Sequence, residues 1–142
     1  MTSNGNYILK TENLDVHYGD LQALHGVSIA IKKGSIVSII GSNGAGKSTL
    51  LNTIVGINKP TKGKVIYDNQ DITGLLTNNI VSKGITMSPE GSRVFEKLSV
   101  KENLLMGAYL PHARKKKDEL MEKVFELFPV LKEKSSQLAT YL

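Results

Sequence analysis

The feature that most constrains this chain is a glycine-rich stretch that separates an apolar run from an amphipathic run. The stretch extends from Gly41 to Thr49 and fits the pattern G-x-x-x-x-G-K-[ST] at every fixed position. Residues 35–40, which precede it, are mostly apolar and β-branched and predict a strand buried on both faces. Residues 47–55 predict a helix that ends at Gly56 and turns four apolar side chains to the core: Leu50, Leu51, Ile54 and Val55.

A loop of this kind offers several groups that bind phosphate. Its glycines let successive backbone N–H groups point at phosphate oxygens, and the helix N-terminus adds a partial positive charge. Lys47 would hold the β- and γ-phosphates of a nucleotide, and the Ser48 hydroxyl would ligate Mg²⁺. A glycine-rich turn that binds nothing is the alternative, which the agreement of strand, loop, lysine, hydroxyl and helix disfavours. The predicted nucleotide-binding residues of the loop are Gly41, Ser42, Asn43, Gly44, Ala45, Gly46, Lys47, Ser48 and Thr49.

Length, charge and cysteine content limit the other possibilities. A chain of 142 residues suffices for one domain or for an incomplete part of a larger one. The net charge of +5 admits a polyanionic partner, but four of the positive charges form the run Arg114–Lys117, which has no interleaved aromatic residues. We therefore expect a solvated helix start there and no nucleic-acid site. The lack of cysteine excludes disulfides and thiolate metal sites, and no apolar run approaches the roughly 20 residues of a membrane span.

The segments around the loop predict a mixed α/β chain. Residues 7–18 and 21–31 predict an antiparallel hairpin with its turn at Gly19-Asp20. Residues 64–67 predict a short strand, and the spacing of the apolar residues in 72–83 is compatible with a helix. Residues 85–88 then predict a second parallel core strand.

The C-terminal third of the chain predicts a ligand-facing loop and two helices. The loop 89–95 follows the strand predicted at 85–88, and open α/β sheets bind ligands at the carboxyl ends of their strands. Ser99 and Glu102 form a capping box that opens a helix through about Tyr109. Residues 115–128 predict an amphipathic helix with one apolar face: Leu120, Val124, Leu127 and Phe128.

Taken together, these motifs resemble the ATP-binding subunit of an ABC transporter, from Ile8 to the last residue. Within the family, the chain is most similar to the ATPase subunits of bacterial branched-chain amino-acid importers. The stretches that carry this closer similarity are His17–Gly19, Ala23–Ser28, Asp71–Thr73, Pro89–Phe95, Val100–Leu104 and Glu126–Pro129. Three alternatives remain open: an ABC ATPase for another substrate, a binding module without turnover, and a stand-alone P-loop kinase or GTPase, whose downstream motifs we do not find.

The resemblance implies an α/β fold with a P-loop NTPase core. It divides residues 1–142, as part of a nucleotide-binding domain, into an antiparallel β region (7–34), the P-loop core (35–98) and part of a helical subdomain (99–142). The family's signature motif would begin at the last residue of this chain, and the Walker B strand would follow it. We therefore expect the full-length protein to hydrolyse ATP, and this chain alone to bind ATP without hydrolysing it.

The resemblance also implies site residues outside the loop. Tyr18 matches the aromatic residue that stacks on adenine, with a core or edge-strand tyrosine as the alternative. Glu90 stands where most members have a glutamine that approaches the metal and the attacking water. Glu90 is therefore the candidate catalytic residue and, with Ser48, a candidate Mg²⁺ ligand; a solvated loop acid is the alternative. Arg93 and Phe95 match the surface that receives the coupling helix of the membrane subunit, unless they are an ordinary loop arginine and a core phenylalanine.

The cofactors implied are ATP and Mg²⁺. The partners implied are transmembrane permease subunits, a second ATPase subunit and, indirectly, a periplasmic or surface substrate-binding protein, with no nucleic acid. These partners imply a peripheral location at the cytoplasmic face of the cell membrane.

Overall fold

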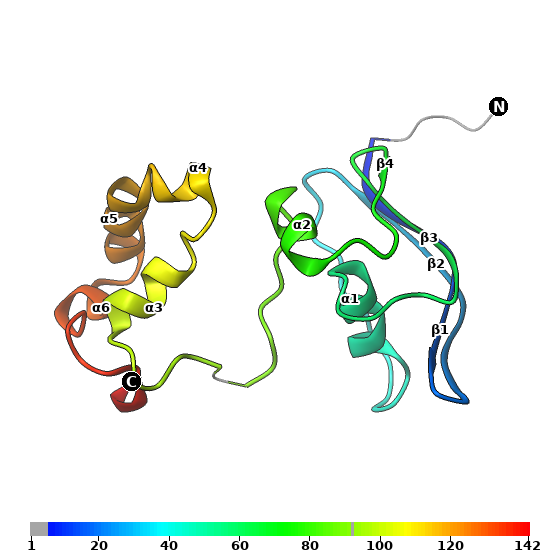
Figure 1. The fold of residues 1–142 in the computed structure, drawn as a ribbon, viewed down its shortest axis with the longest axis horizontal. Helices are drawn as coiled ribbons and strands as arrows, with labels where there is room; N and C mark the ends of the chain where they lie inside the picture. Colours follow the sequence, from blue (N-terminus) through cyan, green and yellow to red (C-terminus); the bar gives the residue numbers. More distant parts are fainter. Residues whose placement is uncertain (1–5, 92) are drawn as a thin grey trace. The chain divides into compact units, whose positions relative to one another are not determined.

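The computed structural model describes residues 6–91 and 93–142 (Figure 1). The chain divides into two compact units, Met1–Met87 and Ser88–Leu142, and each is described here by itself. Within the described residues, no helix is long and apolar enough to cross a membrane.

The first unit is built on a four-stranded antiparallel sheet in the order β2-β1-β3-β4. The strands are β1 (Tyr7–Tyr18), β2 (Leu21–Lys32), β3 (Lys62–Tyr67) and β4 (Gln70–Asp71). Gly19 takes a positive φ of 58° in the turn that joins β1 to β2. The predicted hairpin and the predicted short strand are therefore confirmed.

A bulge in the β1–β2 pair is stabilised by a buried threonine. The register shifts between Thr11 and Leu14, where the regular ladder bonds are interrupted. Thr11 is 2% exposed, and its hydroxyl donates to the carbonyl oxygen of Val27 at 3.1 Å and accepts from the backbone N–H of Ile29 at 3.0 Å. The side chain thus satisfies two backbone groups that the bulge would otherwise leave unpaired.

Helices α1 (Lys47–Ile54) and α2 (Thr77–Ser82) complete the core of the first unit. The core cluster contains Leu14, Val16, Leu24, Leu50, Ile54, Val65, Ile72 and Ile80. Helix α1 begins where it was predicted to begin and ends before Gly56, which has a φ of 78°. The prediction that Leu51 faces the core is wrong, because 44% of Leu51 is exposed. Helix α2 is shorter than predicted, since Ile72 pairs with Val65 in an extended segment.

Two predicted parallel strands are wrong. Residues 35–40 and 85–88 have no strand assignment, and Ile36 and Ile40 are 100% and 95% exposed. A parallel strand needs at least one neighbouring strand for its ladder of hydrogen bonds, and parallel sheets occur almost only where both faces are covered. Within residues 6–91 and 93–142, the sheet contains only antiparallel strands, so neither segment has a neighbour with which to form a ladder.

The second unit is helical. It contains α3 (Val100–Met106), α4 (Pro111–Arg114), α5 (Lys117–Leu127), α6 (Pro129–Glu133) and a 3-10 turn, η1 (Ala139–Tyr141). The predicted capping box is confirmed: the backbone N–H of Glu102 donates to the Ser99 hydroxyl, and the backbone N–H of Ser99 donates to the Glu102 carboxylate at 2.7 Å. Helix α3 ends at Met106, three residues before the predicted end.

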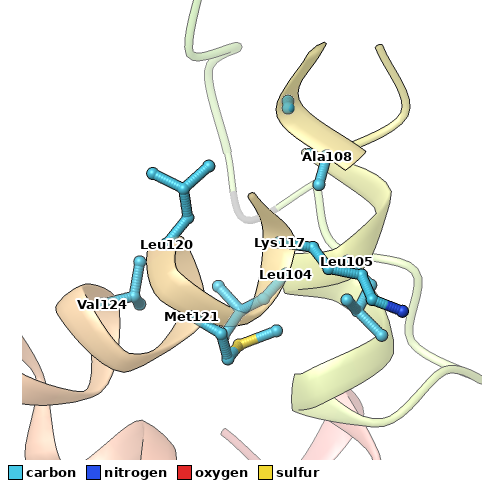
Figure 2. Close-up of a pocket in the computed structure, with 9 residues that line it drawn as sticks. Leu104, Leu105, Ala108, Lys117, Leu120, Met121 and Val124 are labelled. Carbon is cyan, nitrogen blue, oxygen red and sulfur yellow. The ribbon is translucent and has the colours of Figure 1, made fainter. Parts of the chain in front are cut away.

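The apolar face predicted for residues 115–128 is partly wrong. Phe125 is the buried side chain of α5, whereas three of the four predicted residues are exposed: Leu120 (40%), Leu127 (74%) and Phe128 (56%). The helix stops at Leu127 because Phe128 has a non-helical backbone, with φ −132° and ψ 75°, and Pro129 starts α6. A pocket of about 120 Å³ lies in this unit, between α3 and α5. Figure 2 shows the residues that line it. Its lining is mainly apolar: Leu104, Leu105, Gly107, Ala108, Ala113, Lys117, Leu120, Met121 and Val124.

Candidate functional site

The glycine-rich loop ends at the N-terminus of α1, and Gly46 forms the junction. Gly46 is the N-cap residue, with φ 89° and ψ 6°, and its carbonyl accepts the first helical bond from the N–H of Leu50 at 2.9 Å. A Cβ atom at Gly46 would lie 2.7 Å from Cδ2 of Leu24 and 3.0 Å from the carbonyl oxygen of Ala23. Strand β2 therefore supports the loop at a distance that only glycine permits.

The electrostatics of this helix start favour an anion. No side chain caps α1, and no acidic residue occupies its first turn. The backbone N–H groups at a helix start carry a partial positive charge, which a capping carboxylate would offset. In the loop itself, the N–H of Ala45 donates to the carbonyl oxygen of Ser42 at 3.2 Å, and Gly44 has a φ of 82°. The loop is thus turned tightly in front of an uncapped helix.

The ammonium group of Lys47 lies against the loop that it follows. Its Nζ atom donates to the carbonyl oxygens of Gly41 at 2.9 Å and Ser42 at 2.7 Å. An ammonium group has three donors and no acceptor. The lysine therefore holds a positive charge beside the loop, where phosphate oxygens could replace the carbonyls as its acceptors.

The residues present fit a magnesium ion that arrives with a nucleotide. Among residues 6–91 and 93–142, no three His, Asp or Glu side chains gather into a metal site. Mg²⁺ in nucleotide sites is usually held by one or two protein groups together with phosphate oxygens and waters. Ser48, in the first turn of α1, would contribute its hydroxyl as such a group.

Tyr18, predicted as the adenine-stacking residue, lies beside the loop helix. Its hydroxyl donates to Oγ1 of Thr49 at 3.4 Å and accepts from Nδ2 of Asn58 at 2.6 Å. The ring is 49% exposed, so Tyr18 is not a core residue. The structure thus brings together two predicted site residues, Tyr18 and Thr49, while their nucleotide-binding role stays a prediction. Sequence reasoning missed Asn58, because no spacing rule links it to a tyrosine 40 residues away.

Glu90 lies in the second unit, in an exposed loop. Its backbone carbonyl accepts from Nε of Arg93 at 3.2 Å. The other predicted metal ligand, Ser48, belongs to the first unit. The catalytic and metal-binding roles of Glu90 therefore remain predictions from the sequence. Ser92, which belongs to the same stretch, lies outside the described residues.

Sequence reasoning also missed Asn103, which shapes the loop before α3. Its Oδ1 atom accepts from the backbone N–H of Phe95 at 2.8 Å, and its Nδ2 atom donates to the carbonyl oxygens of Phe95 at 3.0 Å and Ser99 at 3.0 Å. The ring of Phe95 is 57% exposed, so it is not the core phenylalanine of the alternative reading. The sequence did contain a signal for this role, because Asn103 comes four residues after the N-cap serine. Amide side chains in the first turn of a helix readily form hydrogen bonds with nearby backbone groups.

Comparison with known proteins identifies similar chains. A family model described as "ABC transporter" matches residues 24–141. The chain is 45% identical over 135 residues to the high-affinity branched-chain amino acid transport ATP-binding protein BraG of Pseudomonas aeruginosa, with 93% of this chain covered. It is 37% identical over 136 residues to the probable branched-chain amino acid transport ATP-binding protein LivG of Methanocaldococcus jannaschii, with 88% covered.

Solved structures agree with this similarity. A nucleotide-free ATP-binding cassette from an ABC transporter superposes with a TM-score of 0.78 at 35% identity, over 96% of this chain and 59% of that one. The ADP conformation of an ATP-binding cassette of an ABC transporter gives a TM-score of 0.74 over the same shares. The chain spans only 56% of the BraG relative and 53% of the LivG relative.

Proposed function

Because the chain belongs to the ABC transporter family, we propose that it is an ATP-binding subunit that powers import of branched-chain amino acids. The family assignment supports nucleotide binding as the task of the glycine-rich loop. The names of the BraG and LivG relatives support the substrate class. An ABC ATPase for another substrate is the competing function, because membrane subunits and binding proteins select the substrate in this family.

The observation that carries the proposal is the contact of Lys47 with its own loop. Nζ lies 2.7 and 2.9 Å from two loop carbonyls, next to the uncapped start of α1. Both acceptors are neutral backbone oxygens, so these contacts leave the positive charge of the ammonium group available to an anion. Positive charge, turned backbone and a helix N-terminus together form a site suited to a polyphosphate.

The residues of this chain would act by binding and orientation. Loop N–H groups and the start of α1 would donate to phosphate oxygens, while Lys47 would exchange its carbonyl acceptors for the β- and γ-phosphates. Mg²⁺, when bound, neutralises part of the phosphate charge, and Ser48 would supply one of its oxygen ligands. The ring of Tyr18 would stack on the base and orient the nucleotide.

The same reasoning leads us to propose that this chain binds ATP without hydrolysing it alone. Phosphoryl transfer needs a positioned water, a metal held from more than one side and charge stabilisation at the γ-phosphate. Glu90 is the candidate residue for positioning the water or binding the metal, but a single carboxylate cannot meet all of these requirements. Turnover would therefore require a second ATPase subunit and further protein groups.

The second unit would provide the contact with a membrane partner. Phe95 is exposed and its backbone is held by Asn103, so the ring is presented on a braced loop with Arg93 close by in sequence. We propose that transmembrane permease subunits dock at this loop, with a substrate-binding protein acting through them. The chain would then work at the cytoplasmic face of the membrane.

Uptake by cells tests this function. Deletion of the gene that encodes this chain should abolish uptake of radiolabelled leucine, isoleucine and valine but leave ribose uptake intact. The unmodified gene should restore uptake, whereas the same gene carrying Lys47→Ala should not. Normal leucine uptake in the deletion strain, or loss of ribose uptake instead, would refute the assigned substrate class.

A further inference from the structure

Tyr18 is an exposed aromatic residue whose hydroxyl is held on both sides. It is the last residue of β1, immediately before the turn at Gly19, and 49% of its surface is exposed. The hydroxyl accepts from Nδ2 of Asn58 at 2.6 Å and donates to Oγ1 of Thr49 at 3.4 Å. A phenolic hydroxyl has one donor, so the contact with Thr49 uses it, and Asn58 uses an acceptor position.

The segment that carries Asn58 is itself fixed in place. The backbone N–H of Asn58 donates to the carbonyl oxygen of Asn52, in α1, at 3.2 Å. Three residues later, the N–H of Thr61 donates to the carbonyl oxygen of Asp15 at 2.8 Å, and the Thr61 hydroxyl contacts Nδ1 of His17 at 2.9 Å. Asn58 therefore lies on a short connection that is anchored to both α1 and β1.

An exposed ring without such contacts would sample several rotamers. Binding a base would then require the ring to be ordered, and the lost side-chain freedom would weaken binding. Hydrogen bonds to the phenolic oxygen reduce this freedom in the free protein. The shorter of the two bonds comes from Asn58, which makes the asparagine the stronger restraint.

We propose that Asn58 is a positioning residue that holds the Tyr18 ring ready to stack on the base of a bound nucleotide. The inference rests on the proposed nucleotide-binding function and adds a residue to it. The role of Thr49 is different from that of Asn58. Thr49 belongs to the predicted phosphate-binding loop and also accepts a hydrogen bond from Tyr18. Among the predicted site residues that the structure describes, the Asn58 side chain has a hydrogen bond with Tyr18 only.

Comparing the binding of ATP with the binding of a ligand that has no base distinguishes a positioning role of Asn58 from a purely structural role. Affinities for Mg²⁺-ATP and Mg²⁺-tripolyphosphate are measured by calorimetry for the unmodified chain, Asn58→Ala, Tyr18→Phe and the double variant. Loss of one hydrogen bond should weaken ATP binding roughly 3- to 10-fold. Tripolyphosphate binding should not change, since that ligand has no base. The double variant should be no weaker than Tyr18→Phe, because both changes remove the same bond.

Asn78→Ala, at an exposed position of α2, is the matched control and should bind both ligands normally. Tyr18→Phe keeps the ring and tests the bond even if Asn58→Ala fails to fold. Equal losses for ATP and tripolyphosphate, or an unchanged ATP affinity in both single variants, would overturn the positioning role. If the unmodified chain binds neither ligand, the proposed nucleotide-binding function is overturned together with the role of Asn58. Failure of the positioning role alone is therefore distinguishable from failure of the proposed function.

Discussion

Lys47 donates a 2.7 Å hydrogen bond to the carbonyl oxygen of Ser42, five residues earlier in the same glycine-rich loop. The contact shows that the lysine side chain folds back against its own loop. A charged donor bound to a neutral acceptor is readily transferred to a phosphate oxygen, which is a better acceptor. Binding would thus exchange partners of the ammonium group with little rebuilding of the loop.

The glycine that joins this loop to α1 should tolerate no side chain. Gly46→Ala would strain a residue with a φ of 89° and would press a methyl group against Leu24 and the backbone of Ala23. Gly44→Ala is the matched control, because Gly44 has a φ of 82° but nothing within 4 Å of the added carbon. We expect about 1–2 kcal/mol of destabilisation from strain in both variants, and about 1–3 kcal/mol more in Gly46→Ala from overpacking. Chemical denaturation measures the free energy of unfolding of both variants. Equal values would contradict the close approach of β2 to Gly46.

The buried threonine of β1 should be required for the bulge. Thr11→Val keeps the side-chain volume but removes the hydroxyl that pairs with Val27 and Ile29. Leaving these partly buried backbone groups unpaired should lower the free energy of unfolding by roughly 1–2 kcal/mol. Thr86→Val, at an exposed position, should change the denaturation midpoint little. If Thr11→Val leaves the free energy of unfolding unchanged, water or a shifted strand register must satisfy the two backbone groups in place of the hydroxyl.

The capping box should make the helical unit sensitive to acid. The Ser99 hydroxyl, and secondly the Ser99 backbone N–H, hold the pKa of Glu102 below its ordinary value of 4.5. Because the folded pKa is the lower one, the stabilisation is fully present above the ordinary value and is lost as the pH falls through the folded pKa.

NMR titration of the Glu102 side chain measures this shift directly. Ser99→Ala should return the pKa toward its ordinary value and should lower stability at neutral pH by about 1 kcal/mol through loss of the N-cap. An unshifted Glu102 in the unmodified chain would show that the box does not form in solution.

Features that depend on a few neighbouring residues could be predicted from the sequence. The turn at Gly19, the start of α1 at Lys47 and the Ser99–Glu102 box were all predictable, because each depends on contacts within about four residues. The glycine-rich loop before α1 was predictable for the same reason, since its pattern is contiguous; its nucleotide-binding role stays a prediction.

Features that depend on distant partners could not be predicted. Residues 35–40 have the composition of a buried strand, but a strand needs neighbours that hydrophobicity alone does not reveal. Phe125 rather than Phe128 is buried, and which of the two phenylalanines packs inside depends on the elements around α5 rather than on its own periodicity. The bond between Tyr18 and Asn58 joins residues 40 positions apart, so no local pattern indicated it.

The most direct test of the proposed nucleotide site is calorimetry of Mg²⁺-ATP binding to the unmodified chain, to Lys47→Ala and to Lys33→Ala. Lys33 lies in the exposed turn after β2, so its replacement removes the same charge outside the loop. We expect the unmodified chain and Lys33→Ala to bind alike, and Lys47→Ala to bind roughly 10- to 100-fold more weakly through loss of charge-assisted hydrogen bonds. A folded chain that does not bind Mg²⁺-ATP, or equal binding by Lys47→Ala, would contradict the assignment of the glycine-rich loop as its nucleotide site.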